Sequence, residues 1–203
     1  MNKEKISGFE TLFKLFINVN LSASKISKQT CGTIAKSINT LSIVNALNLS
    51  NNPIGVDGSK KLSNLNLKYL NLSKCQLGVG GAQAIANIIS KSSIETLICS
   101  SNKINVEGAR FIGKAIEESK TLQIFDISSN LIRDKGMKAI TEGLFENHSI
   151  KVISVKNNGL KDDGFNLFIK TYMGHPGTQL STALFSSNDI SIYTLKLTEQ
   201  LFI

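Results

Sequence analysis

The sequence predicts an α/β fold in which short strand–turn–helix units repeat along the chain and stack into one solenoid. The phrase Leu-x-Leu-Ser-x-Asn, seen in full over residues 47–52, returns with a period of about 28 residues. A period of this size indicates stacked units that share one continuous core. Inside each unit the apolar spacing changes from two residues, as in a strand, to three and four, as in a helix. Such an architecture favours a function carried by a surface.

Seven units align on one marker position, which is mostly asparagine. The markers are Ser24, Asn52, Cys75, Asn102, Asn130, Asn158 and Asn188. The positions three, five and eight residues before the marker, and two after it, are apolar in every unit, which chance would not produce. Because the first two of these columns are two residues apart, alternate side chains face the core and the segment is a strand.

The second half of each unit predicts a helix of about three turns. A glycine follows the marker by six residues in five units, and we expect the helix to begin there: Gly58, Gly81, Gly108, Gly136 and Gly164. In stretches such as residues 81–89 the apolar residues lie three and four apart. Each unit is therefore a short strand, a turn and a helix.

On these columns the chain resembles leucine-rich repeat proteins of the ribonuclease-inhibitor-type subclass, over about residues 12–203. The resemblance implies a right-handed horseshoe with a concave parallel β-sheet and α-helices on the convex side. Strands about 4.8 Å apart and helices about 8 to 10 Å apart bend the stack in that direction. We expect residues 1–203 to form one domain, with an N-terminal cap over 1–15 and seven repeats over 16–203, the last one truncated. The family serves many functions, so the resemblance does not define one.

Composition favours an intracellular protein that needs no disulfides. The chain has 203 residues, of which 41% are hydrophobic, enough for a large distributed core. No apolar run is long enough to cross a membrane, and Glu10 and Lys14 interrupt the N-terminal stretch that a secretory signal peptide would need. Cys31, Cys75 and Cys99 fall at repeat-defined core positions, where we expect buried thiols. The expected location is the cytoplasm, or a host cytosol if the chain is delivered there.

Features of an enzyme are scarce in this sequence. The two histidines, His148 and His175, lie between repeats, where we expect solvated loops. Asp162 and Asp163 resemble a carboxylate pair, but they stand where a helix begins, and negative charge is favourable there for ordinary reasons. No phosphate-cradling glycine loop and no zinc-ligand spacing occurs. We therefore expect no enzyme activity, no cofactor and no metal.

The outward positions of the strands are the candidate binding site. Two, four and six residues before each marker the side chains face away from the core, and the serine column at two before belongs to the repeat pattern itself. The other columns vary freely and expose apolar and aromatic groups in the middle of the arc, which suggests a contact site for a partner protein. The alternative is that these are scattered exposed apolar residues, which are normal. The predicted partner-binding residues are Tyr69, Asn71, Thr96, Ile98, Ile124, Asp126, Val152, Ser154 and Lys156.

Charge is distributed asymmetrically along the chain. Through residue 93 there are eleven lysines against three carboxylates, which accounts for the whole net charge of +8. A basic patch is expected on the convex side or its flanks, from Lys25, Lys28, Lys36, Lys60 and Lys61. Such a field attracts an acidic protein, membrane phosphates or nucleic acid. Nucleic acid is disfavoured because arginines and stacking aromatics are missing there, and lysine is also a common surface filler.

The sequence thus predicts a non-enzymatic module that binds a partner protein, of unknown identity, through the concave face. Three alternatives stay open. The chain could be a regulator resembling Ran-type GTPase-activating proteins, or it could bind weakly to a membrane surface by electrostatic attraction. It could also be a bacterial effector acting in a host cell, a role that is compatible with the protein-binding module. A dimer through the C-terminal edge is also expected, since an exposed edge strand invites pairing. Whether residues 192–203 cap that edge themselves is left open.

Overall fold

The computed structural model describes residues 17–41, 43–172, 177–191 and 193–194, in which strands and helices alternate as the repeats predict. The predicted cap over residues 1–15 and the tail after residue 194 lie outside the described residues. The elements in chain order are β1 (Ile17–Asn20), α2 (Lys28–Leu41), β2 (Val44–Asn48), α3 (Gly55–Leu62), β3 (Tyr69–Asn71), α4 (Gly78–Lys91), β4 (Thr96–Ile98), α5 (Val106–Glu118), β5 (Ile124–Asp126), α6 (Arg133–Phe145), β6 (Val152–Ser154), α7 (Asp162–Tyr172) and β7 (Thr182–Leu184).

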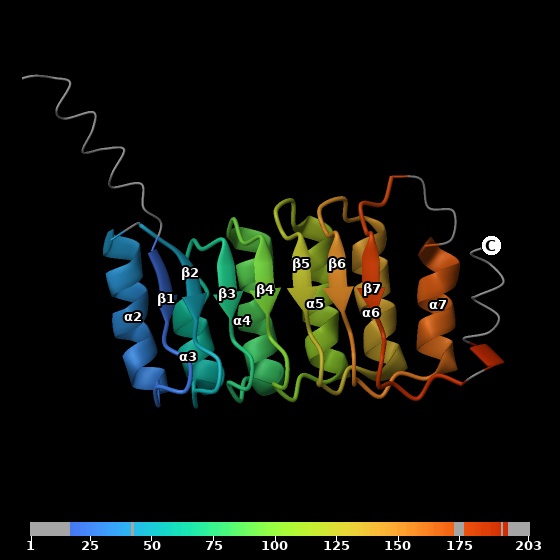
Figure 1. Ribbon diagram of the computed structural model, residues 1–203, viewed down its shortest axis with the longest axis horizontal. Coiled ribbons are helices and arrows are strands. Elements are labelled where there is room, and N and C mark those ends of the chain that lie inside the picture. Colours follow the sequence, from blue (N-terminus) through green and yellow to red (C-terminus); the bar gives the residue numbers. More distant parts are fainter. Residues whose placement is uncertain (1–16, 42, 173–176, 192, 195–203) are drawn as a thin grey trace, which may run out of the picture.

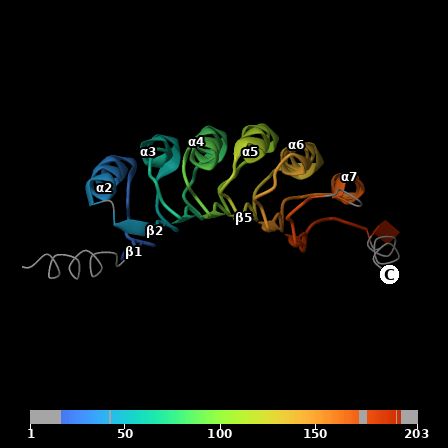
Figure 2. The same ribbon diagram turned by 90° about the horizontal axis from the view of Figure 1, so that it is seen from above.

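The seven strands form one parallel sheet in simple chain order, as Figure 1 shows. The register follows the repeat alignment, because Leu70 pairs with Leu97, Leu97 with Phe125 and Phe125 with Ile153. Seen from above, the helices line the outer, convex side of an arc and the sheet lies on its inner side (Figure 2). The predicted α/β solenoid with a concave sheet is therefore confirmed.

The core lies between the sheet and the helices and is built from the apolar columns. In the fifth repeat Leu122, Phe125, Ile127 and Ile132 are all fully buried. Helix α6 closes this layer with Met137 and other side chains that face the sheet. Side chains from neighbouring repeats form one continuous cluster, so each repeat is stabilised mainly by those stacked on either side of it.

The marker asparagines form a hydrogen-bonded ladder behind the sheet, where each strand ends. Asn102 is fully buried. Its Nδ2 donates to Leu72 O at 2.8 Å, to Cys99 O at 3.0 Å and to Ser100 O at 3.2 Å. Its Oδ1 accepts from Cys75 N at 2.8 Å and Leu77 N at 3.3 Å. One side chain thus satisfies backbone groups of two successive repeats, and this explains why the position is asparagine so often.

Cys75 fills one rung of this ladder only in part. Its Sγ donates to Leu49 O at 3.2 Å, as an asparagine amide would. A thiol offers little as an acceptor, and Ile54 N instead donates to the carbonyl of Asn52 at 2.8 Å. The repeat between Asn52 and Cys75 is also the shortest, at 23 residues, and its helix α3 has 8 residues. The prediction of three helical turns is therefore wrong for this repeat.

The helices begin earlier than expected. Helix α6 starts at Arg133, three residues before Gly136, so the prediction that the glycine marks the helix start is wrong. A Cβ added at Gly136 would lie 2.9 Å from Ala109 Cβ of the preceding helix. Glycine at this position therefore permits close approach of consecutive helices.

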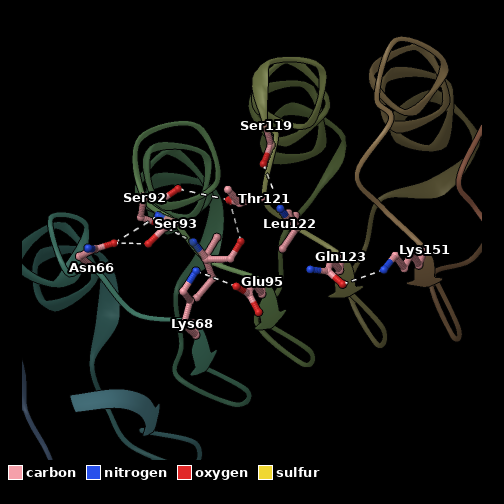
Figure 3. A network of polar contacts seen from close by, with 11 residues as sticks. Asn66, Lys68, Ser92, Ser93, Glu95, Ser119, Thr121, Leu122, Gln123 and Lys151 are labelled. Carbon is pink, nitrogen blue, oxygen red and sulfur yellow. Dashed lines mark hydrogen bonds and ion pairs between the residues drawn. The ribbon is translucent and has the colours of Figure 1, made fainter. Parts of the chain in front are cut away.

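At the other ends of the strands, where the chain passes from each helix into the next strand, polar side chains connect neighbouring repeats (Figure 3). Thr121 Oγ1 donates to Ile94 O at 2.9 Å, and Ser149 Oγ donates to Leu122 O at 2.9 Å in the next repeat. Lys68 Nζ lies 2.6 Å from Glu95 Oε1 on the same edge. Hydrogen bonds therefore connect neighbouring repeats at both ends of the strands, which holds the inner surface in place. Within the described part of the chain, no helix has the length and apolar character needed to span a bilayer.

Candidate functional site

The predicted partner-binding residues lie in two rows that cross the middle strands on the inner face. Because the strands pair in register, side chains at equal positions stand next to one another. The first row is Tyr69, Thr96, Ile124 and Val152, and the second is Asn71, Ile98, Asp126 and Ser154. Adjacent members of a row are separated by about 4.8 Å, the distance between strands. Lys156 follows β6 by two residues and is half-buried.

Exposure differs among these side chains. Ile124 is the most open, with 42% of its surface accessible, although the side chain is a large hydrocarbon. Tyr69, Thr96, Ile98 and Val152 are half-buried. Apolar side chains therefore meet solvent in the middle of the face, on β3 to β6.

Ser154 is less available than the sequence suggests. It is only 9% exposed, and its Oγ lies 2.7 Å from Ser128 Oγ. Ser73 and Ser100 make the same kind of contact between their hydroxyls, at 3.0 Å. These two pairs of serines therefore join neighbouring repeats, and their hydroxyls belong to the floor of the inner face.

Asn71 and Asp126 have a structural role that the sequence analysis missed. Asn71 Oδ1 accepts from Ser73 N at 2.9 Å and from Ser73 Oγ at 2.7 Å, and Asp126 Oδ1 accepts from Ser128 N at 2.9 Å. Each side chain therefore caps the backbone two residues further on, in the manner of an Asx turn. The recurrence of Asn or Asp two residues before Ser was the signal that would have revealed this role.

A hollow of about 330 Å³ opens on the inner face over the first three strands. It is lined by Asn18, Val19, Asn20, Ala46, Leu47, Asn48 and Tyr69. Of these residues only Tyr69 was among the predicted contacts. The asparagines escaped notice because amide side chains at strand ends look like ordinary features of the repeat.

The predicted basic patch lies on the helical side. Lys25, Lys28, Lys36, Lys60 and Lys61 are all exposed, in the loop before α2 and on α2 and α3. Lys28 Nζ lies 3.3 Å from Asp57 Oδ2, and Lys61 Nζ donates to Lys28 O at 3.0 Å. Two of the five lysines are therefore engaged with the protein itself, and the structure does not bring the set into the inner face.

Aromatic side chains gather at the C-terminal end of the described stack. The rings of Phe165 and Phe185 lie 5.0 Å apart edge to face, and Phe168 stacks on Tyr172 at 4.7 Å. They line a groove of about 380 Å³ beside β7, the last strand of the sheet. Burial raises the pKa of the Tyr172 hydroxyl well above its usual range. The predicted dimer edge is here, and it stays a prediction.

The cysteines and histidines, which act in many catalytic and metal sites, lie as follows. All three cysteines are free and buried. Burial raises the pKa of the Cys75 thiol to about 11, raises that of Cys99 well above its ordinary value, and raises that of Cys31. His148 is exposed, with its Nδ1 lying 3.2 Å from Gly177 O. His175 lies outside the described residues.

Of the two neighbouring carboxylates Asp162 and Asp163, Asp162 has a clear structural role. Asp162 is the first residue of α7, and its Oδ1 accepts from Ser191 N at 2.7 Å. This backbone hydrogen bond, together with one from the Ser191 side chain, lowers the pKa of the Asp162 carboxyl. Asp162 therefore connects its helix to the next repeat. Over the described ranges no group of three histidine, cysteine, aspartate or glutamate side chains is placed to hold a metal ion.

Comparison with known proteins agrees with the architecture. Residues 44–63, 63–86 and 118–140 match the family model described as Leucine Rich repeat. These matched segments, together with the seven-stranded parallel sheet and alternating helices, support a leucine-rich repeat solenoid. Its markers are 28, 23, 27, 28, 28 and 30 residues apart, and the ribonuclease-inhibitor-type subclass stays a prediction. No curated protein sequence matches the chain.

Several solved structures resemble it in part. The actin-binding site 2 of leiomodin-1 is 18% identical, with a TM-score of 0.46 over 67% of this chain and 68% of that one. The structure of the Rad7–Elc1 complex from yeast gives 16% identity and a TM-score of 0.49, over 93% of this chain and 58% of that one. The complex of TLR13 with ssRNA13 gives 13% identity and a TM-score of 0.43, over 89% of this chain and 31% of that one. The present chain thus spans only part of the length of the last two.

Proposed function

We propose that this protein is a non-enzymatic interaction module that binds another protein on the inner face of its sheet. The observation that carries the proposal is the row of Tyr69, Ile124 and Val152, with Ile98 beside it, on a surface that the fold does not use for its core. Ile124 is 42% exposed there. Apolar and aromatic groups surrounded by polar ones are typical of protein contact sites.

A rigid inner face favours binding of the partner. The sheet and the asparagine ladder hold the backbone, and cross-repeat bonds hold both edges, as at Thr121 and Ser149. A partner therefore meets side chains that are already positioned, and the entropy lost on docking is small. The strands β3 to β6 span about 14 Å, three steps between neighbouring strands, which suits a short extended segment or one helix of a partner.

The finer roles depend on who the partner is. An activity like that of Ran-type GTPase-activating proteins, or a role as an effector in a host cell, would use the same inner face. The basic helices α2 and α3 offer a second candidate, because Lys25, Lys36 and Lys60 are exposed near a single carboxylate, Asp57. Weak attraction to an anionic membrane surface would follow from that charge.

The experiment is affinity capture with wild type and the variant Tyr69→Ala/Ile98→Glu/Ile124→Glu, at low and at moderate salt. Lys114→Glu is the matched control, because it makes the same change of two charge units on exposed α5. We expect a partner that wild type and the control retain and the triple variant loses, with all three proteins equally folded by circular dichroism. Capture that survives the triple variant and vanishes with salt assigns binding to the basic helices and contradicts the proposal.

A further inference from the structure

We infer that the first three strands of the inner face form a donor site that binds an acidic segment of the partner, a run of aspartate or glutamate side chains. The inference rests on the proposed use of the inner face and adds the chemistry of one part of it. It comes from the residues that line the hollow over β1, β2 and β3.

Three asparagines at equal positions on these strands are held in one orientation. Asn20 is in register with Asn48, and Asn48 with Asn71. Their Oδ1 atoms accept from the backbone N–H groups of Ser22, Ser50 and Ser73, at 3.1, 3.0 and 2.9 Å. Since these contacts occupy the oxygen, the hydrogen-bond network assigns the amide nitrogen as the other end of each side chain.

The amide nitrogens are the available ends. In the described part of the chain, the Nδ2 groups of Asn20, Asn48 and Asn71 and the hydroxyl of Tyr69 donate no hydrogen bond to protein. The interstrand distance places the three amides at steps of about 4.8 Å. Asn20, Asn48 and Tyr69 also line the hollow of about 330 Å³, together with Asn18. The site therefore presents a row of fixed amide donors.

The surrounding charge selects what such donors bind. Residues 17–93 contain eight lysines and one carboxylate, Asp57, which leaves a balance of +7. Asp57 already lies against Lys28 on the helical side. Among the described residues of the inner strands, the first carboxylate is Asp126, two strands beyond Asn71. Although the lysines of α2 and α3 lie on the helical side, the net positive charge of this part of the chain attracts carboxylates of a partner. At the inner face these carboxylates would meet amide donors, and hydrogen bonds to a charged acceptor are the stronger kind.

The same rows give the bound segment a direction. Beyond Asn71 the row continues with Ile98 and then Asp126. Asp126 repels a partner carboxylate, while Ile98 and Ile124 accept apolar side chains. The acidic part of the partner therefore lies over β1 to β3 and its apolar part over β4 and β5. A nucleic acid fits less well, because residues 17–93 have no arginine and Tyr69 is the one aromatic at these inner positions.

The direct test observes the side-chain amides themselves. Two-dimensional ¹⁵N–¹H NMR of the whole chain is recorded with a hexaglutamate peptide, and in parallel with hexaglutamine, hexalysine and a hexauridylate. We expect hexaglutamate alone to shift the Nδ2 signals of Asn20, Asn48 and Asn71. The inference is overturned if millimolar hexaglutamate leaves these signals in place, or if the oligonucleotide moves them and the peptide does not.

A variant separates the donors from bulk charge. Asn48→Asp/Asn71→Asp keeps the oxygen that caps the backbone, and Asp126 shows that this column accepts aspartate with the same contact. The control Gln83→Glu/Asn87→Asp makes the same charge change on the exposed face of α4. Since each lost charge-assisted hydrogen bond is worth about tenfold in affinity, we expect the first variant to bind hexaglutamate at least about tenfold more weakly than the control. Equal weakening in both overturns the inference.

Failure of this inference is distinguishable from failure of the proposed function. A captured partner that Ile98→Glu/Ile124→Glu loses and Asn48→Asp/Asn71→Asp retains keeps the inner face as the binding surface and refutes its acidic specificity. A partner that both variants retain refutes the use of the inner face altogether. Loss in both variants, with the control unaffected, supports the two together.

Discussion

Replacing Asn102 with alanine tests the asparagine ladder most severely. The side chain is fully buried and makes five hydrogen bonds to backbone groups of two repeats. Two of the five partners keep another donor, because Cys99 O also accepts from Asn130 Nδ2 and Ser100 O also accepts from Lys74 N. Three groups, the N–H of Cys75, the N–H of Leu77 and the carbonyl of Leu72, have only Asn102 among the hydrogen bonds of the described chain.

The cost follows from those three orphaned groups. A buried backbone group without a partner costs about 1 to 3 kcal/mol, so Asn102→Ala should lower the free energy of unfolding by about 3 to 9 kcal/mol. That is a large part of the roughly 5 to 15 kcal/mol that stabilises a typical domain. Because neighbouring repeats depend on one another, the loss should appear in the unfolding of the whole stack.

Urea unfolding followed by circular dichroism measures this change. The control is Asn87→Ala on the exposed face of α4, which should alter stability by no more than about 0.5 kcal/mol. A cost for Asn102→Ala below about 1 kcal/mol, with an unchanged dependence on urea, would show that the asparagine ladder contributes little to stability.

Three further predictions concern the helices and the thiols. Thr141→Val should stabilise the protein by about 1 kcal/mol in the same urea assay, because the buried hydroxyl makes no hydrogen bond to the described residues and the methyl group has the same shape. Gly143→Ala should destabilise it by about 2 kcal/mol or more despite the better helix propensity, since the added Cβ would press on the carbonyl of Gly113 in α5; a gain in stability would contradict this packing. Cys99 should react slowly with an aromatic disulfide reagent up to pH 9, because burial raises its pKa and withholds the thiolate, and should react rapidly only in denaturant.

The fold was predictable because the same pattern of apolar positions recurs in each of the seven units. A single Leu-x-Leu step is weak evidence for a strand, but the column that contains Leu70, Leu97, Phe125 and Ile153 is apolar in every unit, and these four side chains are fully or almost fully buried in the structure. Two details were predicted wrongly, the length of α3 and the residue at which the helices begin. The helix start was placed at the glycine, as at Gly136, because the glycine is recognisable while the preceding turn is not, and its actual role is contact between helices.

The candidate site was harder to predict for a physical reason. Alignment of the repeats identified which strand positions lie on the inner face of the sheet, and the structure places the predicted residues there side by side. The sequence does not reveal which hydrogen bonds each side chain already makes. Asn71 was judged free to bind a partner, yet its oxygen belongs to the local turn and only its nitrogen is left. Ser154 was judged outward and is nearly closed off by Ser128. The Asn71 contact lies within one repeat, and its two-residue spacing was present in the sequence. The Ser128–Ser154 contact depends instead on how closely two repeats approach one another, which no spacing in the sequence specifies.

The central claim is that the inner face touches the partner, and site-specific photocrosslinking measures this directly. A benzophenone side chain is introduced in place of Ile124 on β5, and in a second protein in place of Lys114 on the exposed side of α5. The account predicts a discrete crosslinked protein from position 124 that is absent from position 114 and is competed away by excess unlabelled wild type. A discrete product from position 114 with none from position 124 would contradict the account and move the binding surface to the helices.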